Sequence, residues 1–149
     1  KYAPKKVLGK GNILVIPAYR AGHLVAVQYI AEDGTRAWQA GCKAAGAVFT
    51  FPGTEPVWVV EGFATGASLH DDTGHSVVVA FSASQISSAV HWAKKAFPAE
   101  SVRVMADDDT PGHKAGKAAG VECRIPDFRG LARKPGDNDY NDFVRLRDG

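Results

Sequence analysis

Hydrophobic residues fall in short runs along the first third of the chain, separated by the turn signals that are typical of β-hairpins. Three runs that predict strands cover residues 11–20, 24–30 and 35–39. Glu32-Asp33-Gly34 lies between the second and third runs and is a strong hairpin signal, because glycine tolerates a positive φ. A further short run at 48–51 follows a loop-like segment. The pattern predicts an antiparallel β meander with little room for a helix.

The pattern changes after Pro52-Gly53, where short apolar runs begin to alternate with segments of helical spacing. The predicted strands cover residues 57–60, 75–81, 101–106 and 121–125, and the predicted helices cover about 63–71, 85–96, 110–119 and 139–147. Strands that alternate with helices are typical of a parallel sheet. We therefore expect an α/β fold with a mainly parallel four-stranded sheet flanked by helices. The expected domains are a basic, β-rich subdomain at 1–54 and an α/β domain at 55–149.

Acidic residues follow two of the predicted strands at the point where each ends. Glu61-Gly62 follows the first of the four runs, and Asp107-Asp108-Asp109 follows the third. In an extended segment, Asp107 and Asp109 point the same way and can share a cation, while Asp108 faces elsewhere. If the two strands are parallel neighbours, these acids converge with Glu61 at the carboxyl edge of the sheet, where ligands bind in open α/β folds. Such a cluster needs a cation to stay ionised, and hard oxygen ligands suit Mg²⁺ or Mn²⁺.

A second interpretation of the three aspartates is a solvated acidic turn that caps the following helix, with Thr110 as N-cap and Pro111 as the first helical residue. Without Glu61, the two interpretations of the three aspartates are about equally favoured. Glu61 at the end of another strand favours the metal site. A third oxygen-rich cluster, Asp139-Tyr140-Asn141-Asp142, fits both a helix start and a metal or hydrogen-bonding role.

The composition is that of an ordinary soluble protein. The chain has 149 residues, of which 45% are hydrophobic and 23% charged. No apolar run approaches the ~20 residues that a membrane span requires. Cys42 and Cys123 match no metal-binding spacing and are expected to be free thiols in a reducing compartment, so we expect a cytoplasmic protein. The chain has no G-x-S-x-G, H-E-x-x-H or P-loop motif. The sequence therefore gives no sign of a serine hydrolase, a zinc metalloprotease or a P-loop nucleotide-binding protein.

The small net charge of +2 is unevenly distributed. Residues 1–56 carry seven basic and three acidic side chains, a net charge of +4, whereas residues 57–149 carry eleven basic and thirteen acidic ones, a net charge of −2. A basic first part and an acid-rich second part fit a metal site that faces a polyanion. Chance clustering on a solvated surface is the alternative. On the first interpretation, we expect the meander and the acidic edge to face each other across a groove for a polyanion.

Four segments carry a resemblance to a known family: GNILVIPAYRAGHLVAVQYIAEDGTRAWQAG at 11–41, EGFATGASLH at 61–70, DDDTPGHKAGKAA at 107–119 and DNDYNDFV at 137–144. The chain has an EG pair after one hydrophobic strand, and after a later strand it has a DxD motif followed by PG and a helix. This arrangement resembles the Toprim domain. The segments together are similar to the catalytic core of bacterial-type DNA primases, and most similar to primases of plasmids and mobile elements. Many of these primases carry a further acid four residues after the glutamate, where this chain has Thr65. Either the metal site has one carboxylate fewer, or Thr65 acts through a water.

The resemblance implies a Toprim fold and a primase-like nucleotidyltransferase core that synthesises RNA primers on single-stranded DNA by metal-dependent phosphoryl transfer. The implied catalytic residues are Glu61, Asp107 and Asp109, and the implied ligands of Mg²⁺ or Mn²⁺ are these three together with Asp139. Contacts with nucleic acid or nucleotide are expected from Arg20, Arg36, Lys43, Gly62 and Lys114. The implied partners are a single-stranded DNA template and ribonucleoside triphosphates, with a replicative helicase or relaxase in the parent protein.

Two other functions stay open at this point. A Toprim-type nuclease would cleave phosphodiesters with the same metal ions. The other function is a non-catalytic, metal-dependent nucleic-acid binding module of a larger replication or transfer protein. The threonine at position 65, in place of an acid, favours this function. Primer synthesis by the isolated chain distinguishes the enzyme from the binding module.

Overall fold

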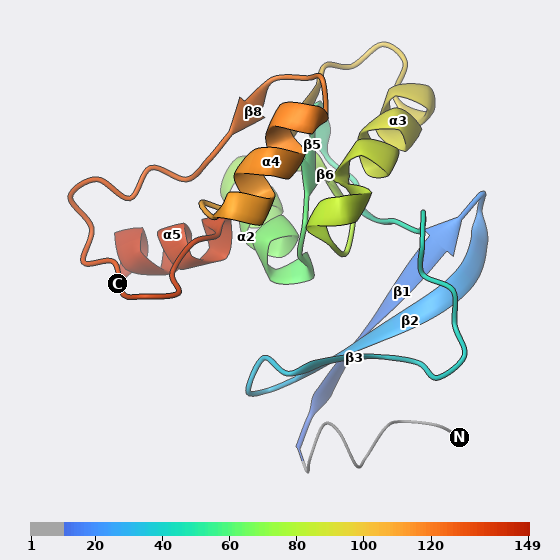
Figure 1. Ribbon diagram of the computed structural model, residues 1–149, viewed down its shortest axis with the longest axis horizontal. Helices are drawn as coiled ribbons and strands as arrows, with labels where there is room; N and C mark the ends of the chain where they lie inside the picture. Colours follow the sequence, from blue (N-terminus) through green and yellow to red (C-terminus); the bar gives the residue numbers. More distant parts are fainter. Residues whose placement is uncertain (1–10) are drawn as a thin grey trace. The chain divides into compact units, whose positions relative to one another are not determined.

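A computed structural model describes residues 11–149, and the first ten residues of the predicted basic subdomain lie outside this range. The chain divides into two compact units, one that ends at Phe49 and one that runs from Thr50 to Gly149. Each unit is built on a sheet of its own (Figure 1). No helix in the described part of the chain is long and apolar enough to pass through a lipid bilayer.

The first unit is built on a three-stranded antiparallel sheet in the order β1-β2-β3. Its strands are β1 (Ile13–Arg20), β2 (His23–Ala31) and β3 (Arg36–Trp38). Ala21 and Gly22 connect β1 to β2 with positive φ angles of 50° and 80°, which suit a two-residue hairpin turn. Ala18 of β1 pairs with Ala26 of β2, and both side chains are buried together with Ile16. The predicted antiparallel meander is confirmed.

The second unit contains a five-stranded sheet in the order β4-β6-β5-β7-β8. Its strands are β4 (Phe49–Phe51), β5 (Thr54–Val60), β6 (His75–Val79), β7 (Val102–Met105) and β8 (Cys123–Arg124). β5 lies at the centre and runs parallel to both of its neighbours, β6 and β7, and β7 runs parallel to β8. The four predicted strands are therefore present in a mainly parallel sheet, and β4 adds a fifth strand at the edge beside β6.

The sequence assigned the run at 48–51 to the meander, and the structure divides this run between the two sheets. Val48 bridges Tyr19 of β1 through two backbone hydrogen bonds of 2.9 and 2.8 Å. Phe49–Phe51 instead forms β4 of the parallel sheet. A run this short has too few alternating positions to indicate its partner, so tertiary pairing decides where it belongs.

Helices flank the sheet of the second unit. They are α2 (Phe63–Thr73), α3 (Ile86–Ala96), α4 (Thr110–Ala118) and α5 (Tyr140–Asp148), with a short 3₁₀ helix, η1 (Ala83–Gln85), before α3. α2 packs against β5, β6 and α5, whereas α3 packs against β5, β7 and α4 (Figure 1). Most valines of the central strands are fully buried, including Val59, Val78 and Val104. Burial on both faces explains why these strands are continuous apolar runs in the sequence.

Candidate active site

The parallel pairing of β5 with β7 brings two acidic strand ends to one edge of the sheet. Val59 of β5 pairs with Val104 of β7 in parallel register. Glu61 directly follows β5, and Asp107 comes two residues after β7 ends. The predicted neighbour relation of the two strands is confirmed. Both acids therefore follow strands at the carboxyl edge of the sheet, the usual position for ligands in an open α/β fold.

Asp109 begins α4 as its N-cap. Its Oδ1 accepts a hydrogen bond from the backbone N–H of Gly112 at 2.7 Å, and its Oδ2 accepts one from Asn138 Nδ2 at 2.9 Å. The prediction that Thr110 is the N-cap and Pro111 the first helical residue is therefore wrong by one position, because the Asp109 carboxylate takes the capping role. The capping function that the sequence offered as an alternative is present, and it fixes the position of this carboxylate.

Asp108 has a different set of partners. Its Oδ1 lies 2.8 Å from His113 Nε2, its Oδ2 accepts from Arg133 Nη1 at 2.6 Å, and its backbone N–H donates to Asn138 O at 2.6 Å. The hydrogen bonds from His113 and Arg133 hold the pKa of the Asp108 carboxyl below its usual range. The charged Asp108 carboxylate therefore stabilises the fold at a pH above its unfolded-state pKa, and this stabilisation is lost as the pH falls through the lowered pKa of the folded state. Through its contacts with Arg133 and Asn138, Asp108 ties the loop after β8 to the acidic edge.

The first turn of α4 lies directly against the backbone of Asp107. A Cβ added at Gly112 would lie 2.3 Å from the carbonyl oxygen of Asp107 and 3.0 Å from its amide nitrogen. Glycine permits this close approach because it has no side chain. Gly112 therefore sets the spacing between α4 and the acidic loop.

Asp139 is the N-cap of α5 and is held from two directions. Its Oδ1 accepts the backbone N–H of Asp142 at 2.8 Å within a capping box, and its Oδ2 accepts the hydroxyl of Thr65 at 3.0 Å. Thr65 is 1% exposed and lies in the first turn of α2, on the helix that follows Glu61. In place of a further carboxylate, position 65 therefore supplies a hydroxyl that contacts Asp139 directly.

We expect Thr65→Val to lower the free energy of unfolding by about 1–3 kcal/mol, because valine keeps the shape of threonine but removes the donor to Asp139 Oδ2. Thr65→Ser keeps the hydroxyl and is expected to retain most of the stability. Urea unfolding followed by circular dichroism measures the difference, with Thr110→Val at an exposed position as the control. Equal unfolding midpoints for Thr65→Val and wild type would contradict this role of the hydrogen bond.

The predicted site residues fall into two groups. The structure brings one group to the acidic edge of the second unit: Glu61, Gly62, Asp107, Asp109 and Asp139, with Lys114 further along α4. Arg20, Arg36 and Lys43 belong to the first unit and are exposed. Arg20 Nη1 donates to Ala45 O at 2.8 Å, so this guanidinium also supports the loop after β3.

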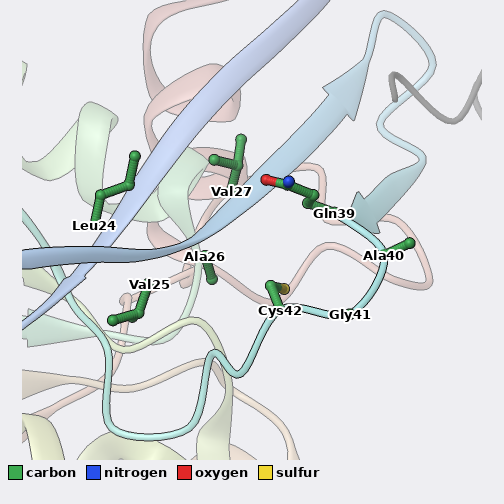
Figure 2. A pocket seen from close by; sticks show the side chains of 8 residues that line it. All are labelled: Leu24, Val25, Ala26, Val27, Gln39, Ala40, Gly41 and Cys42. Carbon is green, nitrogen blue, oxygen red and sulfur yellow. The ribbon is translucent and has the colours of Figure 1, made fainter. Parts of the chain in front are cut away.

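The first unit has a pocket of about 340 Å³ next to this loop. Residues 24–27 of β2 form one wall and residues 39–42, which precede Lys43, form the other (Figure 2). The lining contains no charged side chain. It therefore lacks the cations that offset a phosphate and the carboxylates that bind Mg²⁺, and the acidic edge remains the stronger candidate.

The acidic edge fits a magnesium ion by the chemistry of its donors. Its candidate ligands are all carboxylates, the hard oxygen donors that suit Mg²⁺ and Mn²⁺. Within residues 11–149, no three acidic, histidine or cysteine side chains are grouped closely enough to enclose an ion by themselves. Mg²⁺ is usually bound through one or two carboxylates together with waters and substrate phosphates. The donor set therefore fits an ion that binds together with a nucleotide.

The residues that connect the acidic segments to one another carry no motif in the sequence. Asn138 contacts Asp109 through its side chain and Asp108 through its backbone. Arg133 contacts Asp108 and also donates through Nε to Asp137 O at 2.6 Å. These residues lie in an irregular loop, where no periodicity indicates a partner. The density of Asp and Asn at 137–142 was the one available signal.

Comparisons with known proteins connect this geometry to a family. Residues 56–148 match the family model of the Toprim domain. Two Escherichia coli proteins described as DNA primase TraC are 30% and 29% identical to the chain over 151 residues. The aligned region covers 88% of this chain but only 14% and 10% of the two relatives. The chain thus spans a small part of the curated relatives that it matches.

Solved structures show the same fold. The primase fragment of the bacteriophage T7 primase–helicase protein matches with a TM-score of 0.64 and 19% identity, over 91% of this chain and 58% of that chain. A chain from the structure of the T7 lagging-strand DNA polymerase interacting with primase domains bound to an RNA/DNA hybrid and dTTP matches with a TM-score of 0.61 and 20% identity, over 91% of this chain and 72% of that one. The Toprim model covers most of the chain and contains every acidic residue of the edge. As the motifs predicted, the chain belongs to the Toprim family.

Proposed function

We propose that this chain is the catalytic core of a DNA primase, which joins ribonucleotides on a single-stranded DNA template by metal-dependent phosphoryl transfer. The observation that carries the proposal is the parallel pairing of β5 with β7, because it places Glu61 and the Asp107–Asp109 loop at the same edge of the sheet. Membership of the Toprim family and the relatives described as DNA primases support it.

The proposed ligands of Mg²⁺ or Mn²⁺ are Asp107, Asp109 and Asp139, of which one or two would bind the ion directly and the others through waters. Glu61 is proposed to lie within reach of the ion or its waters. The ion would bind the incoming ribonucleoside triphosphate and offset the charge that develops at the transferred phosphorus. Asp109 and Asp139 are each held by an N-cap hydrogen bond. Carboxylates that are fixed before the ligand arrives lose little conformational freedom on binding, which favours a precise site.

Glu61 is the proposed general base, which accepts the proton of the attacking 3′-hydroxyl. Gly62 is the N-cap of α2 and makes no side-chain cap hydrogen bond. The first-turn N–H groups of α2 therefore have no competing side-chain acceptor from the cap, and a helix N-terminus favours a phosphate group. Gly62 also lets the ligand approach the backbone closely.

The basic residues Arg20, Arg36, Lys43 and Lys114 are proposed to contact phosphates of the template or the nucleotide. Such contacts are screened by salt and carry little sequence information. A replicative helicase or relaxase in the parent protein is the proposed further partner. One of the structural relatives is itself described as part of a primase–helicase protein.

A product assay tests the proposed function. The chain is incubated with single-stranded DNA, labelled ribonucleoside triphosphates and Mg²⁺ or Mn²⁺, and the products are separated on a denaturing gel. We expect short RNA products that require the DNA, the nucleotides and the metal ion. Shortened DNA without RNA would indicate a nuclease instead. DNA binding without either product would indicate a non-catalytic binding module.

We expect the double variant Asp107→Asn/Asp109→Asn to bind Mn²⁺ at least ~10-fold more weakly than wild type, because it removes two of the proposed anionic ligands. Asparagine is a good N-cap, so α4 is expected to keep its start at position 109. Mn²⁺ titration monitored by electron paramagnetic resonance, with and without nucleotide, measures the affinity. Asp127→Asn, at an exposed acid in the loop after β8, is the control. Equal affinities for the double variant and wild type would place the ion elsewhere.

A further inference from the structure

A groove of about 410 Å³ lies between the start of α3 and α4 in the second unit. Ala83 and Ser84 of η1, with Ser87 in the first turn of α3, form one wall. The other wall is one face of α4, made of Pro111, Lys114, Ala115 and Ala118 at helical spacing. Figure 1 shows α4 and the beginning of α3 side by side, in agreement with the packing of α3 and η1 against α4.

The groove is open because α4 packs on the sheet through a different face from the one that lines it. Gly112 and Gly116 are buried, and a Cβ added to them would meet Asp107 and Cys123 respectively. The adjacent face carries small side chains, so the space between α3 and α4 is left unfilled. α4 begins at its N-cap Asp109, and therefore the groove leads away from the acidic edge along this helix.

The chemistry of the lining suits a single negative charge. Lys114 is exposed and, within residues 11–149, its ammonium makes no ion pair or hydrogen bond. The hydroxyl groups of Ser84 and Ser87 lie across the groove from the α4 face, and no acidic side chain is present in the lining. Ser84 Oγ has one hydrogen-bonding neighbour, Ser82 Oγ at 3.1 Å, which leaves capacity for another.

We propose that this groove binds the phosphodiester backbone of a single-stranded nucleic acid, with one phosphate on Lys114 and the serine hydroxyls, and the sugar against the alanine and proline wall. A phosphodiester carries one negative charge, which one ammonium offsets. A triphosphate carries several and is poorly matched by a lining with a single cation. That the bound strand is the template or the primer rests on the proposed function, whereas binding itself does not.

Fluorescence anisotropy with a labelled oligothymidylate, measured across a salt series on the whole chain, tests the proposal. Lys114→Ala is expected to weaken binding about three- to tenfold at low salt and to reduce the slope of log affinity against log salt by about 0.7, the value for one phosphate contact on a single strand. Lys114→Arg should keep the affinity and the salt slope of wild type. Ala118→Trp fills the groove without a change of charge and should also weaken binding.

Two control variants match these changes outside the groove. Lys95→Ala removes one charge from an exposed position on α3, and Ala96→Trp adds the same bulk beside it. Both are expected to bind like wild type, and thermal unfolding checks that every variant is folded. The proposal is overturned if Lys114→Ala and Lys95→Ala have the same affinity and salt slope, or if wild type binds no DNA.

A competition arm separates the strand from a nucleotide. If Lys114→Ala weakens binding of ATP but leaves DNA binding unchanged, the groove is a nucleotide subsite and the proposal fails. Primer synthesis is measured on the same samples. A chain that shows the Lys114 effect but makes no primer would refute the proposed function and support the groove, so the two failures are distinguishable.

Discussion

Glu61→Gln is expected to reduce primer synthesis by roughly 10²–10⁴-fold, the usual contribution of a general acid or base, while stability and DNA binding stay close to wild type. Glutamine has nearly the same shape as glutamate but cannot accept the proton of the 3′-hydroxyl. It also removes a negative charge from the edge where the metal ion is proposed to bind. Glu61 directly follows the buried strand β5, so the strand fixes the position of its backbone in the variant as in wild type.

The measurement combines three readouts on the same protein samples: rate of primer synthesis at saturating metal ion, anisotropy with labelled single-stranded DNA, and thermal unfolding. Glu55→Gln is the matched control, because Glu55 is an exposed residue near the other end of the same strand. It makes the same chemical change and should leave all three readouts unchanged. Primer synthesis at the wild-type rate by Glu61→Gln would show that this carboxylate is not the base.

Gly112→Ala is expected to lower the free energy of unfolding by about 1–3 kcal/mol, as overpacking in a close contact usually does, and to weaken Mn²⁺ binding as well. The new Cβ would overlap the carbonyl oxygen of Asp107, which is backbone and cannot rotate away. The first turn of α4 must therefore shift relative to the acidic loop. Asp109 moves with this turn, because its Oδ1 accepts a hydrogen bond from the backbone N–H of Gly112.

Gly116→Ala provides the comparison within the same helix. Its added Cβ would meet Cys123 Sγ at 2.3 Å, so stability should fall here too. This contact lies one turn further from the acids, and we expect Mn²⁺ affinity to stay near that of wild type. Denaturant unfolding and Mn²⁺ titration of both variants give the contrast. If both variants keep the Mn²⁺ affinity of wild type, or if both lose it equally, Gly112 has no special link with the acidic loop.

The sequence predicted the central part of the fold because parallel strands are buried on both faces and leave clear apolar runs. The runs that became β5 and β7 stand out for this reason, and Glu61 and Asp107 are placed by their positions just after them. β4 was assigned to the wrong sheet because three residues carry no periodicity of their own. Local chemistry also misled the assignment of Thr110, since the neighbouring Asp109 is an equally good cap and takes the position.

The connections between the acidic segments could not be predicted. Asn138 and Arg133 reach Asp109 and Asp108 across 29 and 25 positions of the sequence. Such contacts depend on how an irregular loop folds back, and neither propensity nor spacing encodes that path. For the same reason the sequence left two possible roles for Thr65, and its direct hydrogen bond to Asp139 became visible only in three dimensions.

The contact between Thr65 and Asp139 also has a consequence for the order of events during translation, because its partners are 74 positions apart. A ribosome releases Glu61 and the aspartates after β7 well before it releases α5. Most of the acids of the edge are therefore synthesised before Asp139, the one that begins α5. Completion of the proposed site therefore waits for the synthesis of α5, which packs on α2 and brings Asp139 to Thr65.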